Sequence, residues 1–216
     1  MNFYIIDDVQ ETKRLQAQSN LDTNTAYRRE WCEAWAVNRK NGAYERCPLC
    51  GRPVSMLKWE PPRKMRLVGT KYPDRLSEWL MEPLVVSERF IEAYQRAKLS
   101  GISTFSEIEV VRKKATAPPA PRYYLAEVDY SQSVCIDLHR TILYGEKNNW
   151  SCAVCNPFGS TCSHITHLAL NTAKWDGTDL FRVYAVGTVC SQRFYDFVND
   201  FQFTNFNLVP ISEYTF

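Results

Sequence analysis

The chain has 216 residues, of which 45% are hydrophobic and 13% aromatic, enough for one large domain or two small ones. Its formal net charge is +2 and no long run of like charge occurs, so electrostatics do not indicate a nucleic-acid or membrane partner. No apolar run approaches the length of a membrane helix, and the N-terminus does not read as a signal peptide. We therefore expect a cytoplasmic protein.

The first half of the chain is predicted to contain short strands. Residues 3–6 are apolar and are expected to form a strand, whereas residues 10–25 show no clean period and are expected to run along the surface. Residues 26–37 place aromatic side chains at spacings compatible with one helical face, although a strand is an alternative there. Residues 65–68 and 105–111 have the apolar or alternating pattern of strands.

A helix is predicted from Glu88 onward. Ser87 is a good N-cap, and the charge of Glu88 in the first turn suits the helix dipole. Gly101 is expected to end the helix. The apolar face consists of Phe90, Ile91, Tyr94 and Ala97.

A proline-rich linker follows at residues 115–122, where the prolines favour an extended segment. Beyond it, residues 123–130 and 134–143 are predicted to be strands, which could form a hairpin about Ser131–Ser133. The remaining predicted elements are a strand at residues 168–170, a helix with Phe194, Phe197, Val198 and Phe201 on one face, and a last strand at residues 207–211.

The second half of the chain repeats the first. Residues 189–194 match residues 85–90 nearly one for one, and residues 176–181 resemble residues 74–79. We therefore predict an α+β fold of two related halves, each ordered as cysteine knuckle, strand, helix and strand. The halves are residues 1–114 and 123–216, joined by the linker at 115–122 into one compact unit.

Two Cys-x-x-Cys pairs provide the clearest chemical signal. Cys47 and Cys50 form the first knuckle, and Cys152 and Cys155 form the second about a hundred residues later. Two residues between cysteines let both sulfurs face one ion, and four thiolates complete a closed tetrahedral zinc site. Gly51 and Asn156 follow the pairs and tolerate positive φ. We predict one structural zinc ion that joins the halves like a zinc ribbon.

Other interpretations of the cysteines stay open. A redox Cys-x-x-Cys is the rival, although neither pair has a thioredoxin-like βαβ context. Three residues after the second knuckle could substitute as ligands, namely Cys162, His164 and His167. His139 is expected to be partly buried. The cysteines outside the pairs are interpreted as small buried apolar residues, namely Cys32, Cys135, Cys162 and Cys190.

Catalysis has little support in the sequence. No nucleophile elbow, phosphate loop, dinucleotide fingerprint or His-Glu-x-x-His motif occurs. Ser87 and Ser191 are explained as helix caps, and Arg89 and Arg193 beside them as structural or solvated groups. Four cysteine ligands leave no open position for a catalytic water. We therefore expect no catalytic residues and no enzyme.

In the order of these motifs the sequence resembles the double-CXXCG motif family, a paralogous set known from myxobacteria. The resemblance rests on the strand at Phe3–Tyr4, the two knuckles, and three later motifs. These are Asp179-Leu180-Phe181-Arg182, Ser191-Gln192-Arg193-Phe194, and Thr204-Asn205 followed by Leu208-Val209-Pro210-Ile211. Asn156 departs from the pattern, where the family has glycine.

The resemblance implies an immunity protein that binds a cognate bacterial toxin in the cytoplasm. Exposed tryptophans would be candidate contacts, among Trp31, Trp35, Trp59, Trp79, Trp150 and Trp175. The alternative function is a nucleic-acid-binding zinc ribbon, in which basic clusters at residues 63–66 and 112–114 would contact phosphates. That alternative gains weight if the two clusters converge on one surface.

Overall fold

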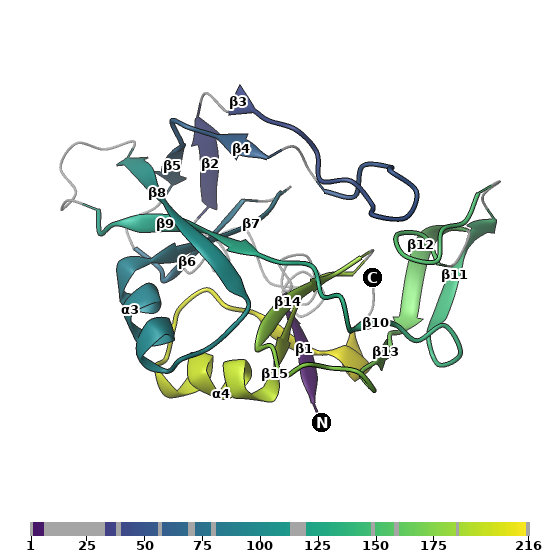
Figure 1. Ribbon diagram of the computed structural model, residues 1–216. Coiled ribbons are helices and arrows are strands. Elements are labelled where there is room, and N and C mark those ends of the chain that lie inside the picture. Colours follow the sequence, from purple (N-terminus) through teal and green to yellow (C-terminus); the bar gives the residue numbers. More distant parts are fainter. Residues whose placement is uncertain are drawn as a thin grey trace, which may run out of the picture.

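The computed structural model describes residues 2–6, 33–37, 40–55, 58–68, 72–78, 81–112, 120–147, 150–157, 160–184 and 186–214. These residues form a mixed structure in which strands predominate and two α-helices occur, as the sequence predicts (Figure 1). The first strands are Phe3–Ile6 (β1), Glu33–Val37 (β2), Lys40–Asn41 (β3), Trp59–Glu60 (β4), Lys64–Val68 (β5), Arg75–Glu78 (β6), Met81–Ser87 (β7) and Ile102–Arg112 (β8). The helices are Glu88–Arg96 (α3) and Gln192–Asp200 (α4).

The later strands are Tyr123–Val128 (β9), Cys135–Ile136 (β10), Ile142–Lys147 (β11), Ser160–His167 (β12), Leu170–Asn171 (β13), Leu180–Val183 (β14), Gly187–Ser191 (β15) and Leu208–Pro210 (β16). A short 3-10 helix, Ile211–Glu213, follows β16. No helix in the described ranges is both long enough and apolar enough to cross a membrane.

Six strands close into a barrel in the order β2-β5-β8-β9-β7-β6. Alternation along β5 explains its orientation, because Met65 and Leu67 are buried while Arg66 between them is exposed. The same alternation on β9 buries Tyr123 and Leu125. The barrel core consists of Trp59, Met65, Leu67, Leu76, Val85, Ile108, Tyr123 and Leu125.

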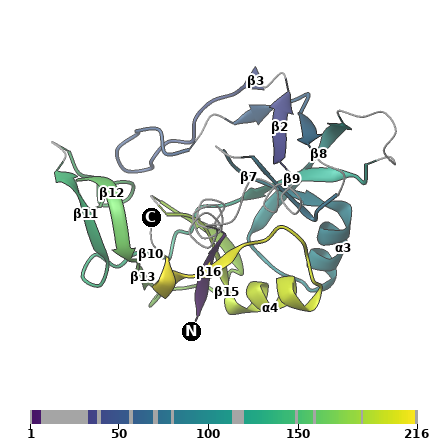
Figure 2. The ribbon, with the colours of Figure 1, turned by 180° about the vertical axis from the view of Figure 1, so that it is seen from behind.

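A second sheet has the order β14-β15-β1-β16, and its strands pair antiparallel. One of its faces packs into a separate core that includes Phe3, Phe181 and Val189. Leu168 and Leu170 join this core from the segment that follows β12. The N-terminal strand is therefore held beside the last strand of the chain (Figure 2).

The two sheets share part of their pairing pattern, although the barrel has six strands and the second sheet has four. In the barrel, β9 pairs with β7 and β8; in the second sheet, β1 pairs with β15 and β16. The hairpin β6–β7 corresponds to β14–β15, the pair β2–β5 to β10–β13, and the pair β3–β4 to β11–β12. Strands β1–β8 form a first series and β9–β16 a second, and each strand of the first has a counterpart eight places later. The first strand of each series lies in the sheet of the other series: β1 pairs within the second sheet, and β9 pairs within the barrel.

Both helices begin at a serine, as predicted. The Ser87 hydroxyl accepts a hydrogen bond from the Phe90 amide at 3.2 Å, and the Ser191 hydroxyl accepts one from the Phe194 amide at 3.3 Å. The buried faces of the two helices meet in one core that also takes in Tyr4 from β1. Phe90 and Phe194 are fully buried there, with their ring centroids 6.2 Å apart.

Some local predictions are wrong. Residues 33–37 form strand β2, so the strand alternative holds there and the helical interpretation does not; residues 26–32 lie outside the described ranges. The predicted hairpin about residues 131–133 does not form, because β9 pairs with β7 and β8 while β10 pairs with β13. Helix α3 was expected to end at Gly101 but ends earlier, at Arg96. Lys98, two residues later, takes a positive φ of +52°. Residues 10–25 and 113–119 are also outside the described ranges.

Candidate metal centre

The two Cys-x-x-Cys segments each lie between the strands of a hairpin. The first knuckle lies between β3 and β4, which pair through Asn41 and Trp59. The second lies between β11 and β12, which pair from Ile142 and His167 to Lys147 and Ser160. Figure 1 shows the first knuckle loop reaching toward the β11–β12 hairpin, so segments about a hundred residues apart in the chain come together.

The four cysteine sulfurs lie together. All four sulfur atoms are within 4.8 Å of one another. Cys47 Sγ is 3.7 Å from Cys152 Sγ, and Cys50 Sγ is 3.5 Å from Cys155 Sγ. A tetrahedral zinc ion with Zn–S bonds of about 2.3 Å requires sulfurs about 3.8 Å apart. The spacing therefore suits one tetrahedral metal ion shared by the two knuckles.

The turns of the two knuckles close differently. In the first, the Gly51 amide donates to the Cys47 carbonyl at 2.9 Å, and Gly51 has φ +72°. In the second, Cys152 and Asn156 exchange both backbone hydrogen bonds at 3.0 Å. Asn156 is not among the described residues with positive φ, contrary to expectation. Its side-chain amide instead donates to the Trp150 carbonyl at 3.2 Å.

The electrostatics of the cluster favour a bound cation. Hydrogen bonds from the backbone of Cys155 and Val154 lower the pKa of the Cys152 thiol to about 6. Burial alone would raise the pKa of Cys47, but backbone hydrogen bonds from Cys50 and Leu49 outweigh it and the pKa is lowered. Burial and the neighbouring thiols raise the pKa of Cys155. Adjacent thiolates repel one another, and a divalent cation between them removes that repulsion.

Contacts outside the cysteines also join the two parts of the chain. The Arg52 guanidinium lies 3.8 Å from the centre of the Trp150 ring, which links the two knuckles. Arg182 on β14 pairs with Glu45 at 3.2 Å and stacks on Tyr130. These contacts hold the first knuckle against the second sheet independently of a metal ion.

The structure tests only one of the three substitute ligands that the sequence offers. Within the described residues, the four paired cysteines are the only group of three or more His, Cys, Asp or Glu side chains close enough to share a metal ion. His167 is not part of this group. The side chains of Cys162 and His164, and Cys32, lie outside the described set. His139 is exposed, so the expectation that it is partly buried is wrong.

The other cysteines and the tryptophans have mixed outcomes. Cys190 is fully buried as predicted, whereas Cys135 is exposed, contrary to prediction. Trp59 is buried in the barrel, while Trp150 and Trp175 are half-buried. None of these three is an exposed anchor. The side chains of Trp31, Trp35 and Trp79 are not described.

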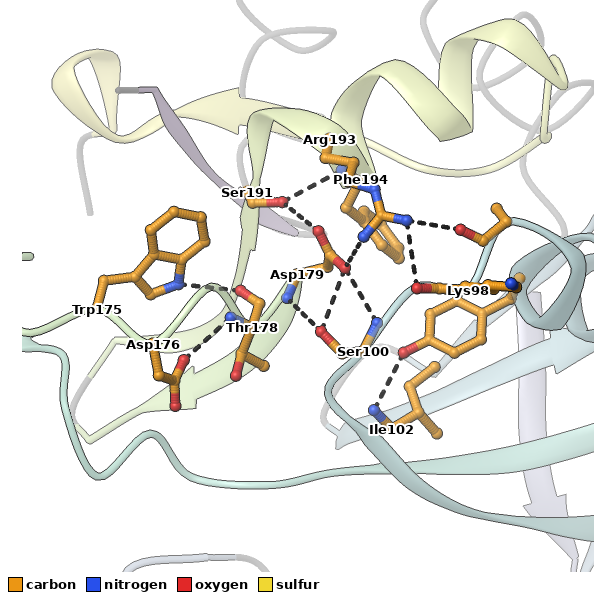
Figure 3. Close-up of polar contacts among 12 residues, drawn as sticks. Lys98, Ser100, Ile102, Trp175, Asp176, Thr178, Asp179, Ser191, Arg193 and Phe194 are labelled. Carbon is orange, nitrogen blue, oxygen red and sulfur yellow. Dashed lines mark hydrogen bonds and ion pairs between the residues drawn. The ribbon is translucent and has the colours of Figure 1, made fainter.

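A buried carboxylate organises the start of α4 (Figure 3). Asp179 Oδ1 accepts from the Ser191 hydroxyl at 3.1 Å, and Oδ2 accepts from Arg193 at 3.0 Å. The same Oδ2 accepts from the amide and the hydroxyl of Ser100, in the loop after α3. Arg193 also donates to the carbonyls of Ala97 and Lys98. The start of α4 is thereby bound to the end of α3.

The other helix has the reciprocal arrangement. Asp74 accepts from the Ser87 hydroxyl at 3.0 Å and from Arg89 at 2.9 Å. Its Oδ2 also accepts from the amide and the hydroxyl of Thr204, in the loop after α4. Arg89 donates to the Phe201 carbonyl at the end of α4. We call these two groups the Asp179 clamp and the Asp74 clamp.

Sequence reasoning explained the two serines and missed the two aspartates. Asp179 rather than Asp176 is the counterpart of Asp74, because each accepts from a capping serine and its carbonyl accepts from that serine's amide at 2.8 Å. Asp176 instead accepts from the Thr178 amide in a local turn. The available signal was an aspartate at nearly the same distance before each Ser-x-Arg-Phe segment.

Parts of the two basic clusters lie on neighbouring strands. Residues 64–66 belong to β5 and Arg112 ends β8, and these strands pair in parallel from Lys64 and Glu109 to Leu67 and Arg112. The cluster at residues 63–66 is partly neutralised within the protein. Lys64 forms an ion pair with Glu109 at 2.6 Å, and Arg63 donates to the Trp59 carbonyl. The side chains at residues 112–114 lie outside the described set.

Comparison with known proteins identifies a family for this chain. No curated protein matches the chain. The model of the Immunity protein family (Imm11) matches residues 16–213, a span that includes both knuckles, both helices and both clamps. A match over most of the chain establishes membership. The chain therefore belongs to this immunity protein family.

Proposed function

We propose that this protein is a non-enzymatic immunity protein that binds a cognate bacterial toxin domain in the cytoplasm and blocks its active site. The observation that carries the proposal is the family match over residues 16–213. The chemistry of the described part is consistent with it. The paired cysteines suit a closed structural site, and the aspartates and arginines beside the helices are engaged in the two clamps.

We propose further that the metal is one structural zinc ion held by Cys47, Cys50, Cys152 and Cys155. The support is the sulfur spacing and the all-sulfur donor set, which favours zinc over hard cations. Such an ion would fill its coordination sphere with protein ligands and would supply folding energy, with no open position for substrate.

The scaffold is proposed to be two related halves, residues 1–114 and 123–216, joined by the linker at 115–122 and by a zinc-ribbon-like site. The matching strand orders and the reciprocal clamps support this relation. Resemblance to the double-CXXCG motif family is kept as part of this proposal. In this view both halves contribute to every stabilising feature, and the toxin meets a surface that they form together.

Co-expression with the product of the adjacent gene tests the function. The candidate toxin is induced in cells that carry this chain, an empty vector, or an unrelated immunity protein. Growth is expected to recover with this chain alone, and the two purified proteins are expected to form a complex. A neighbour that is not toxic, or whose toxicity this chain leaves unchanged, would exclude the immunity function.

The alternative, a nucleic-acid-binding zinc ribbon, is favoured by one observation: β5, which holds residues 64–66, pairs with β8, which ends at Arg112. The Lys64–Glu109 ion pair weakens it, because a neutralised lysine is less available to a phosphate. Titration of single- and double-stranded DNA and RNA at several salt concentrations decides the matter. A steep loss of affinity with salt supports the alternative, whereas no binding at low salt excludes it.

A further inference from the structure

We propose that the toxin binds to a weakly basic apolar surface on the two knuckle-bearing segments of this protein. The toxin would contact it with an apolar face that is surrounded by acidic groups. This inference rests on the proposed function. We define the knuckle surface by five residues, namely Tyr44 and Leu49 of the first knuckle segment and Leu138, Ile142 and Tyr144 of the segment that leads into the second.

The first argument is where apolar side chains are exposed. Leu49 is 63% exposed, Tyr144 is 61% exposed and Ile142 is 52% exposed. Of the large hydrophobic residues that are exposed in the described part of the chain, Phe201 is the one outside the knuckle surface. The five residues belong to the two segments that the four cysteines bring together. Exposed apolar side chains concentrated on one part of a protein mark interaction sites.

The second argument is an asymmetry between the two knuckle hairpins. Around the first knuckle, β3 and β4 have 2 residues each, which suffices to hold the pair of cysteines. Around the second, β11 has 6 residues and β12 has 8. The extra length is therefore not required for the metal site. Figures 1 and 2 show this hairpin standing out from the body on the side away from α3.

Described side chains of the longer hairpin include one in the core and two in solvent. Ile165 on β12 is buried in the core of the second sheet, which anchors the hairpin to the body. Ile142 and Tyr144, two positions apart on β11, are both more than half exposed. Strand β11 thus presents apolar side chains to solvent, while Ile165 on β12 packs into the body.

Charge determines what kind of face fits this surface. Arg46, Arg52 and Lys58 belong to the first knuckle segment, residues 42–58, in which Glu45 is the sole acidic residue. Glu45 is engaged by Arg182 at 3.2 Å and by Lys58 at 3.8 Å. The segment therefore has an excess of positive charge beside Leu49 and Tyr44. A partner with acidic groups around an apolar centre is complementary to it.

The same charges argue against a second copy of this chain as the occupant. A two-fold interface would bring each knuckle surface against itself and so oppose like charges. A toxin domain carries no such restriction, and the family match calls for a protein partner. The knuckle surface also lies beside the metal site, so loss of the metal would disorganise both segments at once.

Binding of the purified toxin to the full-length zinc-bound chain tests the inference. The variants Leu49→Glu and Tyr144→Glu add a negative charge to the knuckle surface, and Lys58→Glu reverses a charge at its rim. Gln95→Glu and Arg96→Glu are the matched controls, because both residues are exposed on α3, away from the knuckles. Metal content and thermal stability are measured for every variant, to separate lost binding from lost folding.

The three knuckle variants are expected to retain metal and to raise the Kd for the toxin by about tenfold or more. The two control variants are expected to change that Kd by less than about twofold. Wild-type affinity in the knuckle variants, with metal retained, would overturn the inference while leaving the immunity function in place. A wild-type chain that neither binds nor neutralises the toxin would overturn both. Self-association that is lost in Tyr144→Glu would instead make the knuckle surface a contact between copies.

Discussion

Asp74 and Asp179 illustrate how a single buried carboxylate can hold several segments. Asp179 is 2% exposed and accepts hydrogen bonds from a helix cap, from an arginine on the same helix and from the loop after the other helix. A charged group is stable at that depth because its acceptor sites are used. Gly101 continues the same loop with φ +111°, and a Cβ there would lie 1.7 Å from the Leu180 carbonyl oxygen. The close approach therefore requires glycine.

Replacing Asp179 with asparagine should destabilise the protein. The amide nitrogen cannot accept hydrogen bonds, so at least one of the donors Ser191, Arg193 and Ser100 loses its partner. We expect the free energy of unfolding, from urea denaturation, to fall by about 2 kcal/mol. Asp196→Asn on the exposed face of α4 is the control, with an expected change within about 0.5 kcal/mol. Equal effects of the two substitutions would contradict the clamp.

The Cys190 thiol should make stability fall at alkaline pH. Burial, and secondly the charge of Asp179, raise its pKa from 9.0, so the folded state keeps the proton where the unfolded chain releases it. The stabilisation is complete below the unfolded pKa and is lost as the pH rises above it, by up to about 1.4 kcal/mol per pH unit.

Cys190→Val removes this dependence without opening a cavity, because valine occupies the matching register position at Val86. Urea denaturation from about pH 8 to about pH 10.5 compares the two proteins. The wild-type free energy of unfolding should decline more steeply above about pH 9 than that of the variant. Parallel curves would show that ionisation of Cys190 does not contribute.

At the scale of elements, the exchange of β1 and β9 is the main organising feature. Tyr4 on β1 pairs with Cys190 and with Pro210, in the sheet built from the end of the chain. Tyr124 on β9 pairs with Val86 and with Glu107, in the barrel built from the first half. Neither sheet is complete without a strand that begins the other series.

Cutting the linker should therefore not separate the molecule. A protease site is inserted within residues 115–118, and the folded protein is cleaved to completion. Both pieces are expected to co-elute at the size of the intact chain, since exchanged strands, clamps and a shared core join them. The same sample in denaturant should give two separate pieces. Separation of the pieces without denaturant would refute the exchange.

Local signals predicted the elements whose cause is local. Ser87 and Ser191 cap their helices as expected, and the strand at residues 3–6 follows from its apolar run. The prediction of a hairpin about residues 131–133 was wrong because strand pairing depends on which side chains become buried together, and these can lie far apart in the sequence. Tyr123 on β9 is completely buried in the barrel core, beside strands that precede it by many residues.

As with the fold, the local part of the candidate site could be predicted from the sequence, whereas its long-range contacts could not. The spacing of Cys47 and Cys50, and of Cys152 and Cys155, predicted which four residues gather, because Cys-x-x-Cys is a local geometric pattern. The clamps were not predicted as networks, since Asp74 reaches Thr204 and Asp179 reaches Ser100 only through the packing of the two helices. Exposure of Ile142 and Tyr144 likewise depends on which face of β11 the body covers.

For the whole molecule, we propose that the four-cysteine site, the clamps and the exchanged strands hold two related halves together. An immunity protein needs a preformed surface, because ordering flexible segments on binding costs affinity. The four clustered cysteines bring together the two knuckle-bearing segments, which also carry most of the exposed apolar side chains described above. Stability and toxin binding should therefore depend on the same ion.

Metal analysis of the purified native protein tests this claim most directly. We predict about one zinc ion per chain, bound by the four cysteines, and its loss in Cys47→Ser or Cys152→Ser together with a lower midpoint of thermal unfolding. Cys135→Ser, at an exposed cysteine outside the cluster, is the control and should retain the ion. A natively folded protein without metal, in which the knuckle cysteines form two disulfides, would contradict the account.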